Sequence, residues 1–402
     1  MKYYIKTFGC QMNVSDSERI AGFLEKPHLN PMPTGRQALL GKERRLFVPT
    51  KDINEADLVI FNTCGVRQMA EDRVYGQIHN IRKQEERSKN KGKRRIIILT
   101  GCLADRKDVQ RRLKDKVDLF IPIDKFFKIE NLKLIENCKL KIENLTQKKQ
   151  SCDYLNIAPN YTNNDSAYVP IMTGCNNFCA YCVVPYARGR EISRPVGDIL
   201  KEIKNLAKKD CKEIILLGQN VNSYRFIDKN SSLPAGRQAP LKPKKIDFPK
   251  LLDSLAQSFP KINFKFLTSH PKDFSEELMK VIAKNKNISR EIHLPIQAGS
   301  DKILKAMNRP YTQKHYLDLI KKAQKIIPDA SFTTDVIVGF PGETQKDFQE
   351  SLKVFKKVNF NEAYINKYSP RPGTAAYKLG DPITLDEKKR REKVLRKLVK
   401  TR

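Results

Sequence analysis

The stretch YVPIMTGCNNFCAYC (residues 168–182) joins a strand-like run, Tyr168–Thr173, to three closely spaced cysteines, Cys175, Cys179 and Cys182. A structural zinc site usually takes four ligands, often from two cysteine pairs, and this triplet offers three. Iron–sulfur clusters are held by cysteine thiolates, and three thiolates on a four-iron cluster leave one iron open to a small molecule. The spacing therefore favours an iron–sulfur cluster over three ordinary buried cysteines.

Three more cysteines, each after a strand-like run, occur in the first quarter of the chain. They are Cys10 after Tyr3–Phe8, Cys64 after Asp57–Asn62 and Cys102 after Arg95–Thr100. In an open parallel sheet, chain segments that leave the carboxyl ends of the strands converge on one crevice. We therefore expect these thiols to meet at one place and to hold a second cluster.

Length and composition favour a cytoplasmic protein of two or three domains. The chain has 402 residues, and Met1–Gly9 lacks the apolar segment of a signal peptide. No apolar run reaches the length of about 18 residues that a membrane helix needs, so we expect no membrane segment. In the reducing cytosol, nine cysteines are more typical of metal binding than of disulfides.

The formal net charge is +32. A charge of this size favours a phosphate-bearing partner such as RNA. The alternative is a general lysine enrichment that covers solvated faces without any partner, and composition does not decide between the two. Charge provides attraction to a nucleic acid but not sequence specificity.

Strand-like runs alternate with helical patterns in two blocks, which predicts an α/β protein. We expect a parallel-sheet α/β domain at 1–135, a polar linker at 136–166, a partial barrel at 167–383 and a basic C-terminal helix at 384–402. The second block has six strand–helix units, which fit a partial (β/α)6 barrel better than a closed barrel of eight units. Its expected strands are Tyr168–Thr173, Glu213–Gly218, Asn263–Thr268, Glu291–Pro295, Phe332–Gly339 and Ala363–Tyr368.

Two local features complete the expected organisation. In the first block, Ser15 or Ser17 is the expected N-cap of the helix Ser15–Leu24. Two matching octamers, PTGRQALL (33–40) and PAGRQAPL (234–241), interrupt the alternation. We interpret them as insertions into surface loops, where added length costs little stability.

Segments around the cysteines resemble the methylthiotransferase branch of the radical S-adenosylmethionine (SAM) enzymes. The matching segments are KTFGCQMNVSDSER (6–19), NTCGVRQMAEDRVYGQI (62–78), TGCLAD (100–105), GCNNFCAYCVVPYARGREISRP (174–195), LLGQNVNSY (216–224), HLPIQAGSDKILKAMNRPYT (293–312), TTDVIVGFPGET (333–344) and YSPRPGTAA (368–376). The opening TFGCQMN (7–13) is similar to the enzymes that modify isopentenyladenosine in tRNA. The resemblance covers about 1–26, 46–135 and 167–390.

The resemblance implies a sulfur-group transferase that adds a methylthio group to C2 of N6-isopentenyladenosine next to the anticodon of tRNA. It implies a 4Fe–4S cluster that cleaves SAM and an auxiliary 4Fe–4S cluster that handles the sulfur, with SAM as both methyl donor and radical source. The implied ligands are Cys175, Cys179 and Cys182 for the first cluster and Cys10, Cys64 and Cys102 for the second. The clusters and SAM would carry the chemistry, so no side chain is singled out as a catalytic group.

SAM contacts are expected at the carboxyl ends of the barrel strands, where such barrels bind their ligands. The candidates are Tyr181, whose ring can lie against a base, and Gly218, Gln219, Asn220, Ser269, Gln297, Ser300 and Asp335. The turn Gly339–Glu343 could let the backbone approach the adenine. The alternative for each position is a tight strand–helix turn without a ligand.

The implied partners are a tRNA carrying isopentenyladenosine, a low-potential electron donor of the flavodoxin or ferredoxin type, and a sulfur donor. Family members usually continue into a small all-β RNA-binding module, whereas this sequence ends at Arg402 after a basic helix. We expect that module to be absent or truncated. The alternative functions are a sister specificity, for threonylcarbamoyladenosine in tRNA or for a ribosomal protein, and a non-catalytic iron–sulfur RNA-binding protein.

Overall fold

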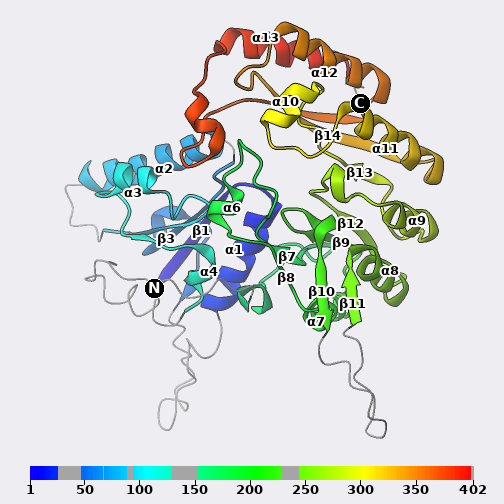
Figure 1. The fold of residues 1–402 in the computed structure, drawn as a ribbon. Helices are drawn as coiled ribbons and strands as arrows, with labels where there is room; N and C mark the ends of the chain where they lie inside the picture. Colours follow the sequence, from blue (N-terminus) through cyan, green and yellow to red (C-terminus); the bar gives the residue numbers. More distant parts are fainter. Residues whose placement is uncertain (26–46, 67, 88–93, 129–152, 229–243, 400–402) are drawn as a thin grey trace, which may run out of the picture. The chain divides into compact units, whose positions relative to one another are not determined.

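The computed structural model describes residues 1–402 except 26–46, 67, 88–93, 129–152, 229–243 and 400–402 (Figure 1). The chain forms two compact units: unit 1 comprises residues 1–162 and 186–189, and unit 2 comprises residues 163–185 and 190–402. The finer division into four parts stays a prediction. Both matching octamers lie outside the described residues.

Within its described residues, unit 1 is built on a parallel five-stranded sheet with the order β2-β1-β3-β4-β5. Its strands are β1 (Lys2–Phe8), β2 (Val48–Pro49), β3 (Leu58–Thr63), β4 (Ile96–Gly101) and β5 (Leu119–Phe120). Its described residues form the helices α1 (Gln11–Leu24), α2 (Gln68–Arg87), α3 (Lys107–Leu113) and α4 (Ile123–Phe126), with 3-10 turns η2 (Ile53–Glu55) and η3 (Asp153–Asn156).

The central strands of unit 1 are apolar on both faces because helices cover both faces of the sheet. Val59 and Phe61 of β3 pack with Ile78 of α2 in one core cluster. The alternate residues Leu58 and Ile60 are equally buried and face the side on which α1 contacts β1 and β3. Figure 1 shows α2 and α3 on one side of this sheet and α1 on the other.

Unit 2 contains six parallel strands, within the described residues, that follow one another in chain order. They are β6 (Ser166–Pro170), β9 (Glu213–Leu217), β12 (Asn263–Phe266), β13 (Glu291–His293), β14 (Ser331–Val338) and β15 (Glu362–Lys367). The first three form one parallel sheet and the last three another. A single parallel bridge between Phe264 and Ile288 lies at the junction. The expected α/β fold, with a parallel N-terminal sheet and a partial six-stranded barrel, is confirmed.

Within the described residues, helices lie between these strands or follow the last of them. They are α6 (Val184–Ala187), α7 (Val196–Ala207), α8 (Phe248–Ser258), α9 (Glu276–Lys284), α10 (Asp301–Ala306), α11 (Gln313–Ile326), α12 (Gln345–Val358) and α13 (Leu385–Arg396). Shorter pieces are the antiparallel pairs β7 (Met172–Thr173) with β8 (Ile192–Ser193) and β10 (Arg225–Asp228) with β11 (Lys244–Asp247), and the turns η4 (Val221–Ser223), η5 (Pro271–Asp273) and η6 (Ala375–Leu379). In the described part of the chain, no helix has both the length and the apolar character needed to cross a bilayer.

The start of α1 differs from the expectation. The helix begins at Gln11 with Cys10 as its N-cap, so the expected caps Ser15 and Ser17 are wrong. Both serines lie inside the helix and are buried. The Ser15 hydroxyl accepts a hydrogen bond from Arg19 (2.7 Å) and the Ser17 hydroxyl bonds Thr7 (2.7 Å). These buried partners use the hydroxyl groups that would otherwise suit a cap.

Candidate active site

Unit 1 brings Cys10, Cys64 and Cys102 to the carboxyl ends of three adjacent strands. The Cys64 N–H donates to the Phe8 carbonyl (2.7 Å), and the Cys102 N–H donates to the Thr63 carbonyl (2.8 Å). The side chains of Cys10 and Cys64 hydrogen-bond each other, and this bond is the main reason why the pKa of Cys10 is lowered to about 6. The three thiols thus gather at one edge of the sheet.

A pair of asparagines holds the first two of these cysteines in place. Asn13 donates from Nδ2 to Asn62 Oδ1 (3.0 Å), and Asn62 donates from Nδ2 to the Asn13 carbonyl (2.8 Å). A Cβ at Gly9 would lie 2.9 Å from the Cys64 Cβ, so only glycine permits this approach. Sequence reasoning missed the two asparagines, although both lie within segments that carry the family resemblance.

A buried ion pair lies in the same unit. The guanidinium of Arg188 contacts Asp16 Oδ2 at 2.6 Å, and both side chains are almost fully buried. The segment Tyr186–Gly189 belongs to unit 1. The positive charge of Arg188 also contributes to the lowered pKa of Cys10, after the hydrogen bond from Cys64 and against the opposing effect of burial.

Unit 2 carries the second cysteine triplet on the loop that follows β7. Gly174 opens this loop with a φ of +79°, which favours glycine. The Cys182 N–H donates to the Cys179 carbonyl (2.9 Å), which folds the end of the loop into a tight turn. Cys175 is buried, and burial raises the pKa of its thiol.

The segment Met307–Arg309 after α10 holds the cysteine loop from its other side. The Ala180 N–H donates to the Met307 carbonyl (3.0 Å). Asn308 donates from Nδ2 to the Phe178 carbonyl (2.9 Å), and Arg309 donates from Nη1 to the Cys179 sulfur (3.4 Å). Tyr181 packs against a core cluster that includes Ala180 and Met307, so its ring is partly used in packing.

Polar atoms without a partner gather at the ends of β9 and β12. At these strand ends, buried side-chain atoms of the described residues that lack a hydrogen bond are Gln219 Oε1, Asn220 Oδ1, Asn222 Nδ2, Ser269 Oγ and His270 Nε2. Such atoms usually bond to a ligand or to water. Gln219, Asn220 and Ser269 are candidates expected from the sequence, whereas Asn222 and His270 add to that set.

Two residues show how this strand end is shaped. Thr268 has a φ of +72°, an uncommon value for a branched residue. Its hydroxyl donates to the Gly218 carbonyl (2.8 Å). A Cβ at Gly218 would lie 2.5 Å from Met172 Cγ, so this glycine also permits close packing.

Burial lowers the pKa of His270 to about 2, which keeps its ring neutral.

Gln297 and Asp335 lie on the other half of the barrel. Gln297 has a φ of +71°, and its N–H donates to the Asp335 carbonyl (2.9 Å). The Asp335 carboxylate lies 3.2 Å from His293 Nε2, and His293 Nδ1 bonds the Thr333 hydroxyl (2.9 Å). The Asp335 carboxylate therefore already has a side-chain partner.

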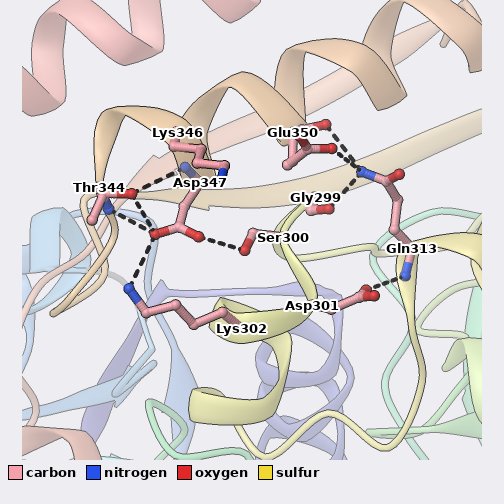
Figure 2. A pocket seen from close by; sticks show the side chains of 9 residues that line it. All are labelled: Gly299, Ser300, Asp301, Lys302, Gln313, Thr344, Lys346, Asp347 and Glu350. Atoms are coloured by element: carbon pink, nitrogen blue, oxygen red, sulfur yellow. Dashed lines mark hydrogen bonds and ion pairs between the residues drawn. The ribbon is translucent and has the colours of Figure 1, made fainter.

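Ser300 lies in a polar pocket between the N-terminal ends of α10, α11 and α12 (Figure 2). The pocket has a volume of about 430 Å³. The Ser300 hydroxyl donates to Asp347 Oδ1 (2.7 Å). Asp347 Oδ2 accepts hydrogen bonds from the Thr344 hydroxyl and from Lys302. The side chains lining this pocket bond largely to one another, and Ser300 is committed to Asp347.

The turn Gly339–Glu343 contacts the C-terminal helix. Glu343 accepts a hydrogen bond from the Gly339 N–H (2.5 Å), and its carboxylate pairs with Arg391 of α13 at 2.6 Å. A Cβ at Gly339 would lie 2.4 Å from Lys388 Cγ. Lys388 and Arg391 are almost fully buried. The expected basic helix is therefore packed on the barrel through two of its positive charges.

Two protein families match this chain, and the two matches agree with its division into unit 1 and unit 2. The Radical SAM superfamily matches residues 169–355, and the Uncharacterized protein family UPF0004 matches residues 2–122. The first match contains the cysteine loop and the ends of β9 and β12 in unit 2, and the second contains the three thiols of unit 1.

Curated relatives match almost the whole chain. A tRNA-2-methylthio-N(6)-dimethylallyladenosine synthase of Thermoanaerobacter pseudethanolicus is 41% identical over 397 residues, which cover 95% of this chain and 74% of the relative. Enzymes of the same name from Carboxydothermus hydrogenoformans and Parabacteroides distasonis are 40% and 39% identical, with 97% of this chain covered. The chain belongs to the radical SAM methylthiotransferase family.

Solved structures of other radical SAM proteins share the fold of this methylthiotransferase family member. The radical SAM methyltransferase TsrM from Kitasatospora setae superposes with a TM-score of 0.57 at 12% identity, covering 94% of this chain and 75% of TsrM. The cobalamin-dependent radical SAM enzyme OxsB superposes with a TM-score of 0.56 at 11% identity, covering 98% of this chain and 56% of OxsB. At these identities the likeness concerns the fold alone.

Membership of the radical SAM superfamily implies a 4Fe–4S cluster and SAM. Among the described residues, no three His, Cys, Asp or Glu side chains are arranged to hold a single metal ion. A four-iron cluster is larger than one ion, so its thiolates surround a space instead of meeting at a point. Three thiols on one short loop, next to buried polar atoms without partners, fit such a cluster with SAM beside it.

Proposed function

We propose that this chain is a tRNA methylthiotransferase that adds a methylthio group to C2 of N6-isopentenyladenosine next to the anticodon. The observation that carries the proposal is the presence of two separate thiol triads, one in each unit of a chain about 40% identical to enzymes named for this reaction. A non-catalytic iron–sulfur protein would not need the polar strand ends beside the second triad.

We assign the two triads to two 4Fe–4S clusters. Cys175, Cys179 and Cys182 would hold the cluster that the superfamily implies, together with SAM. Cys10, Cys64 and Cys102 would hold an auxiliary cluster for the sulfur to be inserted. When bound, these groups supply the methyl group, the sulfur and the radical that removes hydrogen from a carbon without an acidic proton.

The side chains of this chain position those groups. Asn220 and Ser269 present buried polar atoms at the strand ends and would orient SAM. Asn220 is itself fixed, because its Nδ2 donates to Asp273 at 2.6 Å. In unit 1, the Asn13–Asn62 pair fixes the cysteines that would carry the auxiliary cluster. A site held in this way needs little rearrangement when its ligands bind.

The proposed substrate is a tRNA that already carries isopentenyladenosine, and the excess of positive charge, +32, suits a polyphosphate partner. The proposed co-reactants are a low-potential electron donor of the flavodoxin or ferredoxin type and a sulfur donor. A tRNA substrate also favours the cytoplasm as the location.

The two triads should fail in different ways, which tests the proposal. After anaerobic reconstitution, Cys179→Ala should abolish formation of 5′-deoxyadenosine from SAM and of every product. Cys64→Ala should leave 5′-deoxyadenosine formation measurable but abolish methylthiolated tRNA. Chromatography of both products from the same reaction gives the comparison, with Cys211→Ala as the control because Cys211 belongs to neither triad.

Methylthiolated tRNA made by Cys64→Ala at the parent rate would contradict the auxiliary role. The choice of substrate is tested with tRNA carrying isopentenyladenosine, threonylcarbamoyladenosine or unmodified adenosine. Turnover of the first alone supports the proposed specificity, and turnover of the second alone would replace it by the sister specificity.

A further inference from the structure

Arg309 is a buried arginine in unit 2, with 7% of its surface exposed. Its Nε donates to the Tyr311 hydroxyl (2.8 Å), and its Nη2 donates to the Pro295 carbonyl (3.2 Å). Its Nη1 donates to the Cys179 sulfur (3.4 Å). Within the described residues, no carboxylate pairs with this guanidinium.

Other buried arginines of the same unit do have an acidic partner. Arg194 contacts Glu202 at 2.6 Å, and Arg391 contacts Glu343 at 2.6 Å. A charge taken out of water is costly unless an opposite charge accompanies it. The positive charge of Arg309 therefore calls for an anion that the carboxylates around it do not supply.

The group that Arg309 faces can supply that anion. Its Nη1 points at the sulfur of Cys179, one of the three proposed cluster ligands. A four-iron cluster with three thiolates carries a net negative charge, and the charge becomes more negative when the cluster takes up an electron. This step rests on the proposed function, which places such a cluster at Cys175, Cys179 and Cys182.

We propose that Arg309 is the buried counter-charge of this cluster and that its hydrogen bond to the Cys179 sulfur raises the reduction potential of the cluster. Net charge, hydrogen bonds to the sulfurs and exposure to solvent are the factors that set such potentials. A fixed positive charge in a poorly polarisable interior stabilises the reduced, more negative state more than the oxidised state. Arg309 is thus a positioning residue that eases delivery of the electron.

Asn308 provides a matched control for the shape of the loop. It has a φ of +57° and donates from Nδ2 to the carbonyls of Asn177 (3.2 Å) and Phe178 (2.9 Å). It holds the same cysteine loop as Arg309 but carries no charge. A role in shape alone would be shared by both residues, whereas a role through charge belongs to Arg309.

The experiment compares Arg309→Met, Arg309→Lys and Asn308→Ala in a Cys10→Ala/Cys64→Ala/Cys102→Ala background, which leaves one cluster. Each protein is reconstituted anaerobically, and the reduced cluster is followed by electron paramagnetic resonance during a redox titration. Arg309→Met should make reduction at least about tenfold less favourable, a fall in midpoint potential of about 59 mV for a one-electron couple. Arg309→Lys and Asn308→Ala should stay within about threefold of the parent.

An unchanged midpoint potential in Arg309→Met would overturn this inference and leave the proposed function standing. If Arg309→Met takes up no cluster, iron content decides: uptake by Arg309→Lys supports the role of charge. If neither Arg309 variant takes up a cluster while Asn308→Ala takes it up normally, the role of the Arg309 charge is overturned. A parent protein that binds no cluster at these cysteines would overturn the proposed function as well.

Discussion

The buried hydroxyl groups of Ser269 and Ser300 have different surroundings. In the described part of the chain, Ser269 Oγ has no hydrogen-bond partner, and it lies among other unpartnered polar atoms at the strand ends. Ser300 Oγ is committed to Asp347 at 2.7 Å. An unsatisfied buried hydroxyl gains most when a ligand arrives, because its desolvation has already been incurred. The two serines should therefore respond differently to SAM.

Ser269→Ala should weaken SAM binding, and Ser300→Ala should not. Loss of one hydrogen bond to a ligand amounts to about 1 kcal/mol, so we expect the dissociation constant to rise about fivefold for Ser269→Ala. Equilibrium titration of the reconstituted proteins with SAM measures the change. Each variant removes one buried hydroxyl, so the pair is matched. Equal weakening in both would show that the strand ends of β9 and β12 are not the SAM contact.

At the scale of single residues, the sequence predicts which residue types lie at the site but not their hydrogen-bond partners. Position along the chain is enough to propose Gln219, Asn220 and Ser269 as SAM contacts, because each of them follows a predicted strand. Arg309 could not be proposed in this way, because its contact with Cys179 spans 130 residues and exists only in the folded barrel.

At the scale of elements, the N-terminus of α12 depends on one carboxylate. Burial opposes ionisation of Asp347, but hydrogen bonds from Ser300, Thr344 and Lys302 outweigh it and lower its pKa to about 2. Its side chain also completes a capping box with Thr344. Because the pKa is lowered on folding, the charged carboxylate stabilises the fold above the ordinary value of 3.8, and this contribution is lost as the pH falls towards 2.

Asp347→Asn should lower the free energy of unfolding by about 1–2 kcal/mol at pH 7. The difference from the parent should shrink between pH 4 and pH 2, because the parent carboxylate then becomes protonated as well. Urea unfolding across this pH range measures it. Asp386→Asn removes a carboxylate that is 92% exposed and should change stability by less than about 0.5 kcal/mol. A constant difference at every pH would show that the charge of Asp347 is not the cause.

Helix α13 is attached to the barrel by the buried pair Arg391–Glu343. Removing one partner of a buried ion pair leaves an uncompensated charge, so Arg391→Met should lower the free energy of unfolding by about 3–5 kcal/mol. Adding Glu343→Gln should recover part of this loss, since the stranded charge is then removed. Arg390→Met, at a solvent-exposed ion pair, is the control and should leave the free energy of unfolding close to that of the parent, because solvent screens such a pair. Urea unfolding of the parent, Arg391→Met, Glu343→Gln and the double variant gives the coupling energy of the pair, and purely additive losses would contradict it.

The elements themselves are well predicted where apolar periodicity decides them. The expected strand Glu213–Gly218 is observed as Glu213–Leu217, and Phe332–Gly339 is observed as Ser331–Val338. The start of α1 was missed because Cys10 is an unusual N-cap. For α13 the sequence predicted a basic helix, but the burial of Lys388 and Arg391 depends on partners that include Glu343, far away in the sequence.

At the scale of the whole molecule, the net charge of +32 should dominate attraction to tRNA. Each phosphate that the protein neutralises releases counterions, so affinity falls steeply with salt. A surface that contacts six or more phosphates should lose about 10³-fold in affinity between 50 and 200 mM salt. Titration of tRNA with and without isopentenyladenosine at several salt concentrations measures the slope.

Phosphate contacts carry no information about the base. The dissociation constants of the two tRNAs should therefore agree within a few-fold, which corresponds to a difference in binding free energy of about 1 kcal/mol. Only the isopentenylated form should be turned over. A salt-insensitive complex that selects the modified tRNA by affinity would contradict the dominance of charge and would locate the discrimination in binding.

Unit 1 is assembled from two separate segments of the chain, 1–162 and 186–189, and this has a consequence for the synthesis of the protein. Asp16 is fully buried against Arg188, yet the ribosome delivers residues 1–162 well before it delivers Arg188. During that interval the synthesised segment contains the residues of the sheet, the three cysteines and Asp16, but not Arg188. Residues 1–162 alone therefore do not complete unit 1. The ion pair between Asp16 and Arg188 forms only after the cysteine loop of the barrel has been translated.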